Sequence, residues 1–117
     1  MDKDILARKR QEYEKLLEYS AGQIVAKLSD LNVKKISLFG SYARGKSDLF
    51  TDLDVLVIMD TNKSFIERIT EIHRLLALPV DADILCYTPD ELKRMKETPF
   101  LRKALADEVV LYEKGTS

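Results

Sequence analysis

The stretch that decides the fold runs Phe39-Gly40-Ser41-Tyr42-Ala43-Arg44-Gly45 and is followed by Asp52-Leu53-Asp54. Ten residues, 42–51, separate Ser41 from the first aspartate. Residues 53–59 are mostly apolar, which predicts a buried strand, and residues 35–39 predict a shorter strand before the turn. The sequence therefore predicts two strands whose ends bring a Gly-Ser turn and two carboxylates into one region.

The Gly-Ser turn has the composition of a phosphate-binding turn. Gly40 has no Cβ, so its backbone can approach a phosphate closely. Ser41 offers a hydroxyl and an N–H at the start of a predicted helical turn, where anions are favoured. Arg44 fits two roles equally well, because its guanidinium could contact a phosphate or close over the turn. An ordinary strand-to-helix turn has a similar composition and is the alternative interpretation.

The two aspartates are spaced for a shared metal site. Residues two apart on a strand point to the same face, so Asp52 and Asp54 should lie together while Leu53 points into a core. Mg²⁺ prefers oxygen ligands and usually takes one or two carboxylates together with substrate phosphates. Two surface aspartates at a strand edge are the alternative, but the fixed spacing from the Gly-Ser turn favours the metal pair. The turn and the pair together indicate transfer of a nucleotidyl group to an acceptor hydroxyl.

A third carboxylate is expected from residues 80–87, which predict another strand. A carboxylate near the metal pair could bind metal and help to deprotonate the incoming hydroxyl. We favour Asp83, because its apolar neighbours would make an unpaired carboxylate costly. Asp81 is the alternative, although its position near Pro79 suits a solvated residue at the start of a strand.

Composition narrows the class of protein. The chain has 117 residues, 19 Lys plus Arg and 20 Asp plus Glu, with a formal net charge of −1, and its pI is about 5.9. These values predict one domain over residues 1–117 and argue against strong nucleic-acid binding. Cys86 is the one cysteine and His73 the one histidine, so neither a disulfide within the chain nor a structural zinc site is expected. We expect a cytoplasmic protein with no membrane segment, because no apolar run is long enough to span a bilayer.

The remaining sequence alternates helical and strand patterns, which predicts an α/β (α+β) fold with helices packed on a sheet. Residues 1–32 form an N-terminal helical segment, and residues 34–113 form the core. Apolar spacing predicts one helix over 3–31, or two in tandem with a bend at Gly22 and a stop at Asn32. Capping boxes and prolines predict three further helices, one between Ser64 and Pro79 and the others over 89–96 and 99–107. Apolar residues predict a last strand over 109–112.

These residues resemble the minimal nucleotidyltransferases (MNT), small prokaryotic members of the DNA polymerase β superfamily. The resemblance rests on Gly40-Ser41, Ala43-Arg44-Gly45, Asp52-x-Asp54 and Asp83, and it covers about residues 34–113. It implies the nucleotidyltransferase fold, a small mixed central sheet flanked by helices. The family often has Ser just before the metal pair, whereas this chain has Thr51.

The resemblance also implies ligands and a partner. It implies that Gly40, Ser41 and Arg44 hold the triphosphate of ATP, and that the carboxylates that bind Mg²⁺ or Mn²⁺ are Asp52, Asp54 and Asp83. Members of this family commonly pair with a HEPN-domain toxin and act as antitoxins that add AMP to a tyrosine of that toxin. A protein adenylyltransferase antitoxin is therefore the leading hypothesis for this chain.

Two alternatives stay open from sequence. The same fold could neutralise a partner as a non-catalytic, nucleotide-binding module. The chain could instead transfer nucleotides to a small molecule or an RNA end, as a monomer or as a homodimer. The acidic pI and the lack of residues for a separate acceptor domain weigh against this last alternative.

Overall fold

The computed structural model describes residues 2–46 and 48–115 and shows a mixed α/β fold around one four-stranded sheet. The strand order is β3-β2-β1-β4, with β2 parallel to β3 and β1 antiparallel to both β2 and β4. The predicted fold class is confirmed. In chain order the elements are α1 (Lys3–Leu28), β1 (Val33–Phe39), α2 (Gly40–Ala43), β2 (Leu53–Met59), α3 (Phe65–Leu76), β3 (Ala82–Tyr87), α4 (Pro89–Met95), α5 (Pro99–Asp107) and β4 (Val109–Glu113).

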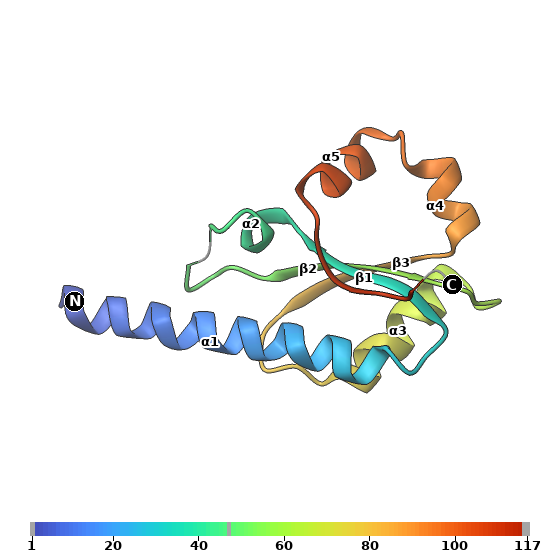
Figure 1. Cartoon of the computed structure of the whole chain (residues 1–117). Helices are drawn as coiled ribbons and strands as arrows, with labels where there is room; N and C mark the ends of the chain where they lie inside the picture. Colours follow the sequence, from blue (N-terminus) through green and yellow to red (C-terminus); the bar gives the residue numbers. More distant parts are fainter. Residues whose placement is uncertain (1, 47, 116–117) are drawn as a thin grey trace.

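Helices cover both faces of the sheet (Figure 1). The helices α1 and α3 lie on one face, where Ile24 and Ile72 pack with Val55 of β2 in the larger core. The helices α4 and α5 lie on the other face, where Leu56 of β2 packs with Ala104 of α5 in a smaller core. Because side chains alternate along a strand, Asp54 shares the face of Leu56 and α5.

The first helix is one continuous element, without the bend that Gly22 suggested. It ends at Leu28, before the stop predicted at Asn32, and the N–H of Ser29 closes its last turn on the carbonyl of Val25. Its buried residues all lie between Leu17 and Leu28, so its C-terminal half packs on the sheet while its N-terminal half projects beyond it (Figure 1). None of the described helices is long and apolar enough to cross a membrane.

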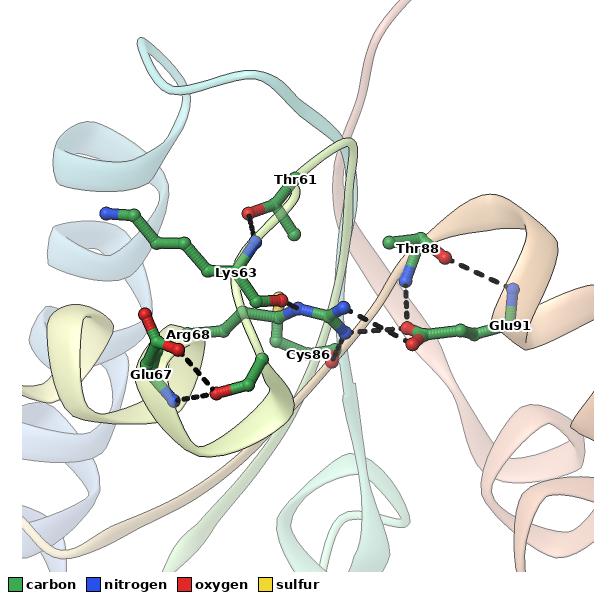
Figure 2. A network of polar contacts seen from close by, with 8 residues as sticks. Thr61, Lys63, Glu67, Arg68, Cys86, Thr88 and Glu91 are labelled. Atoms are coloured by element: carbon green, nitrogen blue, oxygen red, sulfur yellow. Dashed lines mark hydrogen bonds and ion pairs between the residues drawn. The ribbon is translucent and has the colours of Figure 1, made fainter.

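The helices α3 and α4 begin where the capping boxes predict, but only α4 has the complete reciprocal capping box. The hydroxyl of Ser64 accepts from the N–H of Glu67, and that of Thr88 accepts from the N–H of Glu91. Glu91 also accepts from Arg68 of α3 at 2.6 Å, so one carboxylate both caps α4 and joins it to α3 (Figure 2). Three strand boundaries differ from prediction. β1 begins earlier, at Val33, and β4 ends one residue later, at Glu113. β3 begins at Ala82, which leaves Asp81 just outside the strand.

Candidate active site

The predicted site residues meet at one end of the sheet, where β1 ends and where β2 and β3 begin. Antiparallel pairing sets Phe39, the last residue of β1, opposite Asp54 of β2. Parallel pairing sets Asp54 opposite Asp83 of β3. The sheet register therefore brings the Gly-Ser turn and two of the carboxylates together, although 42 positions of sequence separate Ser41 from Asp83.

Gly40 lies in direct contact with the carboxylate of Asp54. Its φ is +75°, a conformation that L side chains rarely adopt, and a Cβ built there would lie 2.1 Å from Asp54 Oδ2. No real Cβ tolerates such a separation. The backbone of Gly40 thus lies too close to the Asp54 carboxylate for any side chain to fit between them, which accounts for glycine at this position.

The carboxylates form a negatively charged group. Burial raises the pKa of Asp54, the charges of Asp83 and Asp52 raise it further, and Arg44 opposes them. Asp54 is half-buried, whereas Asp52 and Asp83 are exposed. A bound divalent cation would offset this repulsion, so the charge and the oxygen ligands both fit Mg²⁺.

The carboxylates by themselves do not supply enough ligands to enclose a metal ion. Over residues 2–46 and 48–115, no three His, Cys, Asp or Glu side chains gather closely enough to hold a metal. An ion at Asp54 would therefore need oxygen ligands from the phosphates of a substrate or from water, which is usual for Mg²⁺.

The structure separates the positions of Asp83 and Asp81. Asp83 pairs with Asp54 in the sheet and raises its pKa, whereas Asp81 lies just before β3 and is not among the charges that act on Asp54. The reason given for favouring Asp83 from sequence was wrong, because its side chain is exposed and not enclosed by apolar neighbours. The sheet register, which no local pattern encodes, is what places Asp83 beside Asp54.

The guanidinium of Arg44 pairs with a carboxylate of α5 and also lies near the hydroxyl of Ser41. Its Nη1 lies 2.9 Å from Asp107 Oδ2 of α5, and its Nη2 lies 3.5 Å from the hydroxyl of Ser41. The helix α2 has four residues, so its N-terminus contributes little to anion binding. Any phosphate would instead rely on the bare backbone at Gly40, the Ser41 hydroxyl and the Arg44 cation.

Sequence reasoning missed residues that contact the site from distant parts of the chain. The Tyr13 hydroxyl of α1 donates to the carbonyl of Thr51 at 2.9 Å and so holds the loop before Asp52. Asp107 had been assigned only as a helix end. Tyr13 is one of the apolar positions that predict the first helix. Nothing in the sequence near Tyr13 or Asp107 indicates a contact with the site.

His73 and Cys86 lie apart, one at the surface and the other in the core. His73 is exposed on α3, and Cys86 is fully buried in the larger core, where burial raises the pKa of its thiol to about 11. His73 also lines a cavity of about 420 Å³ whose walls include Asp52, Asp81 and Asp83. Asp52 and Asp83, but not Asp54, thus border an open space on the side of the sheet end nearest α3.

Comparison with known proteins agrees with this geometry. A candidate protein adenylyltransferase of Methanocaldococcus jannaschii is 30% identical over 83 residues, which cover 67% of this chain and 75% of that protein. A toxin–antitoxin crystal structure with AMP-PNP superposes with a TM-score of 0.62 at 24% identity, over 80% of this chain and 73% of that one. A candidate nucleotidyltransferase from Sulfolobus solfataricus superposes with a TM-score of 0.57 at 19% identity, over 93% of this chain and 87% of that one.

The two structural likenesses lie below 25% identity and establish the fold. The family follows from sequence, because the model of the nucleotidyltransferase domain matches residues 21–112. That match spans the Gly-Ser turn, all the candidate carboxylates, β1 to β3 and all but the last residue of β4. The chain belongs to the nucleotidyltransferase domain family and is a nucleotidyltransferase.

Proposed function

We propose that this chain is an antitoxin that transfers AMP from ATP to a tyrosine hydroxyl of a HEPN toxin, with Mg²⁺ or Mn²⁺ as cofactor. The single observation that supports catalysis most is the register of Asp54 against Asp83 beside the bare backbone of Gly40. A non-catalytic module would have no need for a half-buried carboxylate set against a turn position that only glycine can occupy. The adenylyltransferase relative and the toxin–antitoxin neighbour support the substrate and the partner.

The reaction exchanges one phosphorus–oxygen bond for another. The acceptor oxygen attacks the α-phosphorus of ATP, the bond from that phosphorus to the bridging oxygen of the β-phosphate breaks, and pyrophosphate leaves. Divalent cations held by Asp52, Asp54 and Asp83 would stabilise the charge on the attacking and leaving oxygens. Asp83 is exposed beside the 420 Å³ cavity, so it is positioned to take the proton of an incoming hydroxyl.

The turn orients the triphosphate. Gly40 allows the backbone to approach the phosphates, and the Ser41 hydroxyl donates to a phosphate oxygen. Arg44 already lies near Ser41 and is held by Asp107, so its guanidinium is restrained before substrate arrives. Restraint of this kind lowers the entropy cost of binding.

Mass spectrometry tests the proposed acceptor. The proposed partner, a helical HEPN protein sought among the products of the neighbouring genes, is incubated with this chain, ATP and Mg²⁺, and the modified residue is located by peptide mapping. The proposal predicts AMP on a tyrosine of that protein. A stable complex without any AMP addition would instead support neutralisation by binding alone, and AMP on RNA or on a small molecule would identify a different acceptor.

A further inference from the structure

A second cavity opens on the other side of the Gly-Ser turn, between the end of β1, α2 and α5. Its volume is about 240 Å³, and its walls are mainly apolar. The turn side contributes Phe39, Gly40 and Arg44, and α5 contributes Phe100, Lys103, Ala104 and Asp107. The four α5 residues follow the i, i+3, i+4, i+7 spacing of one helix face, so this face of α5 borders the turn.

The cavity continues directly from the candidate phosphate site. Gly40 contacts Asp54 and also lines this cavity. Phe39 pairs with Asp54 in the sheet and packs in the smaller core beneath α5, so the cavity lies on the same sheet face as the Asp54 carboxylate. A ligand whose phosphates lie along the turn would extend its other end into this space.

The aromatic ring of Phe100 lines the cavity and is largely exposed to solvent. Phe100 is 57% exposed, which is high for a phenylalanine on a packed helix. Its ring contacts the buried ring of Phe39 at a centroid distance of 5.9 Å and an interplanar angle of 89°. This edge contact restrains the ring of Phe100 but leaves surface available for stacking with a flat ligand.

A cation lies on the same helix face. Lys103 is exposed, and the structure gives it no hydrogen bond or ion pair within the residues it describes. Arg44 is already paired with Asp107 across the cavity wall. Lys103 is therefore available to contact the sugar or phosphate end of a ligand whose flat end stacks on Phe100.

We propose that this cavity is a nucleobase subsite, in which Phe100 stacks on the base of the nucleoside triphosphate. The inference rests on the proposed function for its nucleotide substrate. The cavity is smaller than the roughly 300–1,000 Å³ typical of whole small-molecule sites, so it suits a base whose sugar and phosphates lie outside it. The acceptor side chain is a poorer occupant, because this cavity borders the phosphate turn and the acceptor must reach Asp83.

Calorimetric titration tests the subsite with two ligands that differ by a nucleoside. The full chain is titrated in Mg²⁺ with AMP-PNP and, separately, with inorganic tripolyphosphate. Phe100→Ala should weaken AMP-PNP binding by about five- to hundredfold, the range for loss of one base–aromatic stack, and leave tripolyphosphate binding unchanged. Tyr19→Ala is the matched control, because Tyr19 of α1 is also 57% exposed and should leave both affinities unchanged.

Two further variants separate stacking from folding. Phe100→Leu keeps an apolar side chain against Phe39 and should lose AMP-PNP affinity much as Phe100→Ala does, whereas Phe100→Trp should retain it. The inference is overturned if Phe100→Ala binds AMP-PNP as wild type does, or if wild type binds AMP-PNP no more tightly than tripolyphosphate. If wild type binds neither ligand, the proposed nucleotide substrate fails, and the base subsite fails with it.

Discussion

Gly40 is the residue with the tightest steric constraint in the site, and Gly45 provides a matched comparison. Both have positive φ, +75° and +77°, but a Cβ at Gly45 would meet no atom within 4 Å. Alanine at either position should cost about 1–2 kcal/mol of backbone strain. Only Gly40→Ala should also displace the Asp54 carboxylate, which should lower AMP transfer about a hundredfold.

Measuring the unfolding free energy and the transfer rate of both variants separates strain from displacement. Equal losses of transfer in Gly40→Ala and Gly45→Ala would show that the contact with Asp54 does not matter. Retained transfer in Gly40→Ala would contradict the placement of the reaction at this turn.

Asp54 should matter to metal binding and not to folding. Its raised pKa reflects burial and the repulsion of Asp83 and Asp52, so Asp54→Asn removes an unfavourable charge. Without Mg²⁺ the variant should melt at or above the wild-type temperature. Mg²⁺ should raise the melting temperature of wild type and of the exposed control variant Asp90→Asn, but not that of Asp54→Asn. A much lower melting temperature of Asp54→Asn in metal-free buffer would contradict this account.

At the scale of elements, Arg68 is the main polar link between α3 and α4 (Figure 2). Its side chain is 7% exposed and is held by Glu91 at 2.6 Å, by the carbonyl of Lys63 at 2.8 Å and by the carbonyl of Cys86 at 3.2 Å. Glu91→Ala would leave this buried cation without its charge partner, which should cost about 3 kcal/mol. Glu71→Ala is the control, because its ion pair with Lys63 is about half exposed and should contribute less than about 1 kcal/mol.

The same pair predicts an acid dependence of stability. The hydrogen bond from Arg68 and that from the Thr88 backbone lower the pKa of Glu91 from 4.5 to about 2. A lowered folded-state pKa contributes stability above the unfolded value, and this contribution is lost as pH falls from about 4.5 towards 2. Denaturant unfolding of wild type and Glu91→Ala should therefore show a free-energy difference that is full near pH 6 and shrinks over this range. A difference independent of pH would contradict the assigned pair.

The sequence predicts correctly those element boundaries that depend on residues close together in the chain. The starts of α3 and α4 follow from Ser64 with Glu67 and from Thr88 with Glu91, and α5 starts at Pro99. All of these signals act within one helical turn. The end of α1 was misplaced, and Tyr13 was missed, because both depend on contacts distant in sequence. The bond from Tyr13 to Thr51 spans 38 positions, and that from Arg44 to Asp107 spans 63.

Across the whole molecule, helices cover the two faces of the sheet, and the candidate site residues lie at one end of it. The larger core under α1 and α3 and the smaller core under α4 and α5 secure β2 on both faces. The Gly-Ser turn and the carboxylates lie at the sheet end that α2 and the loop before β2 border (Figure 1). Cavities flank this end on two sides, one beside Asp83 and the other beneath α5. This arrangement suits a site that takes a nucleotide from one side and an acceptor from the other.

We propose that the carboxylates of Asp54 and Asp83 act in nucleotidyl transfer, and that the nearby Asp81 does not. The most direct test incubates wild type, Asp54→Asn, Asp83→Asn and Asp81→Asn with the proposed HEPN partner, α-labelled ATP and Mg²⁺, and measures label on that partner. Asp81 is the matched control, because it is an exposed aspartate two residues from Asp83. Wild type and Asp81→Asn should transfer label, while Asp54→Asn and Asp83→Asn should not. Transfer that survives Asp54→Asn, or that is lost in Asp81→Asn and kept in Asp83→Asn, would contradict the assigned site.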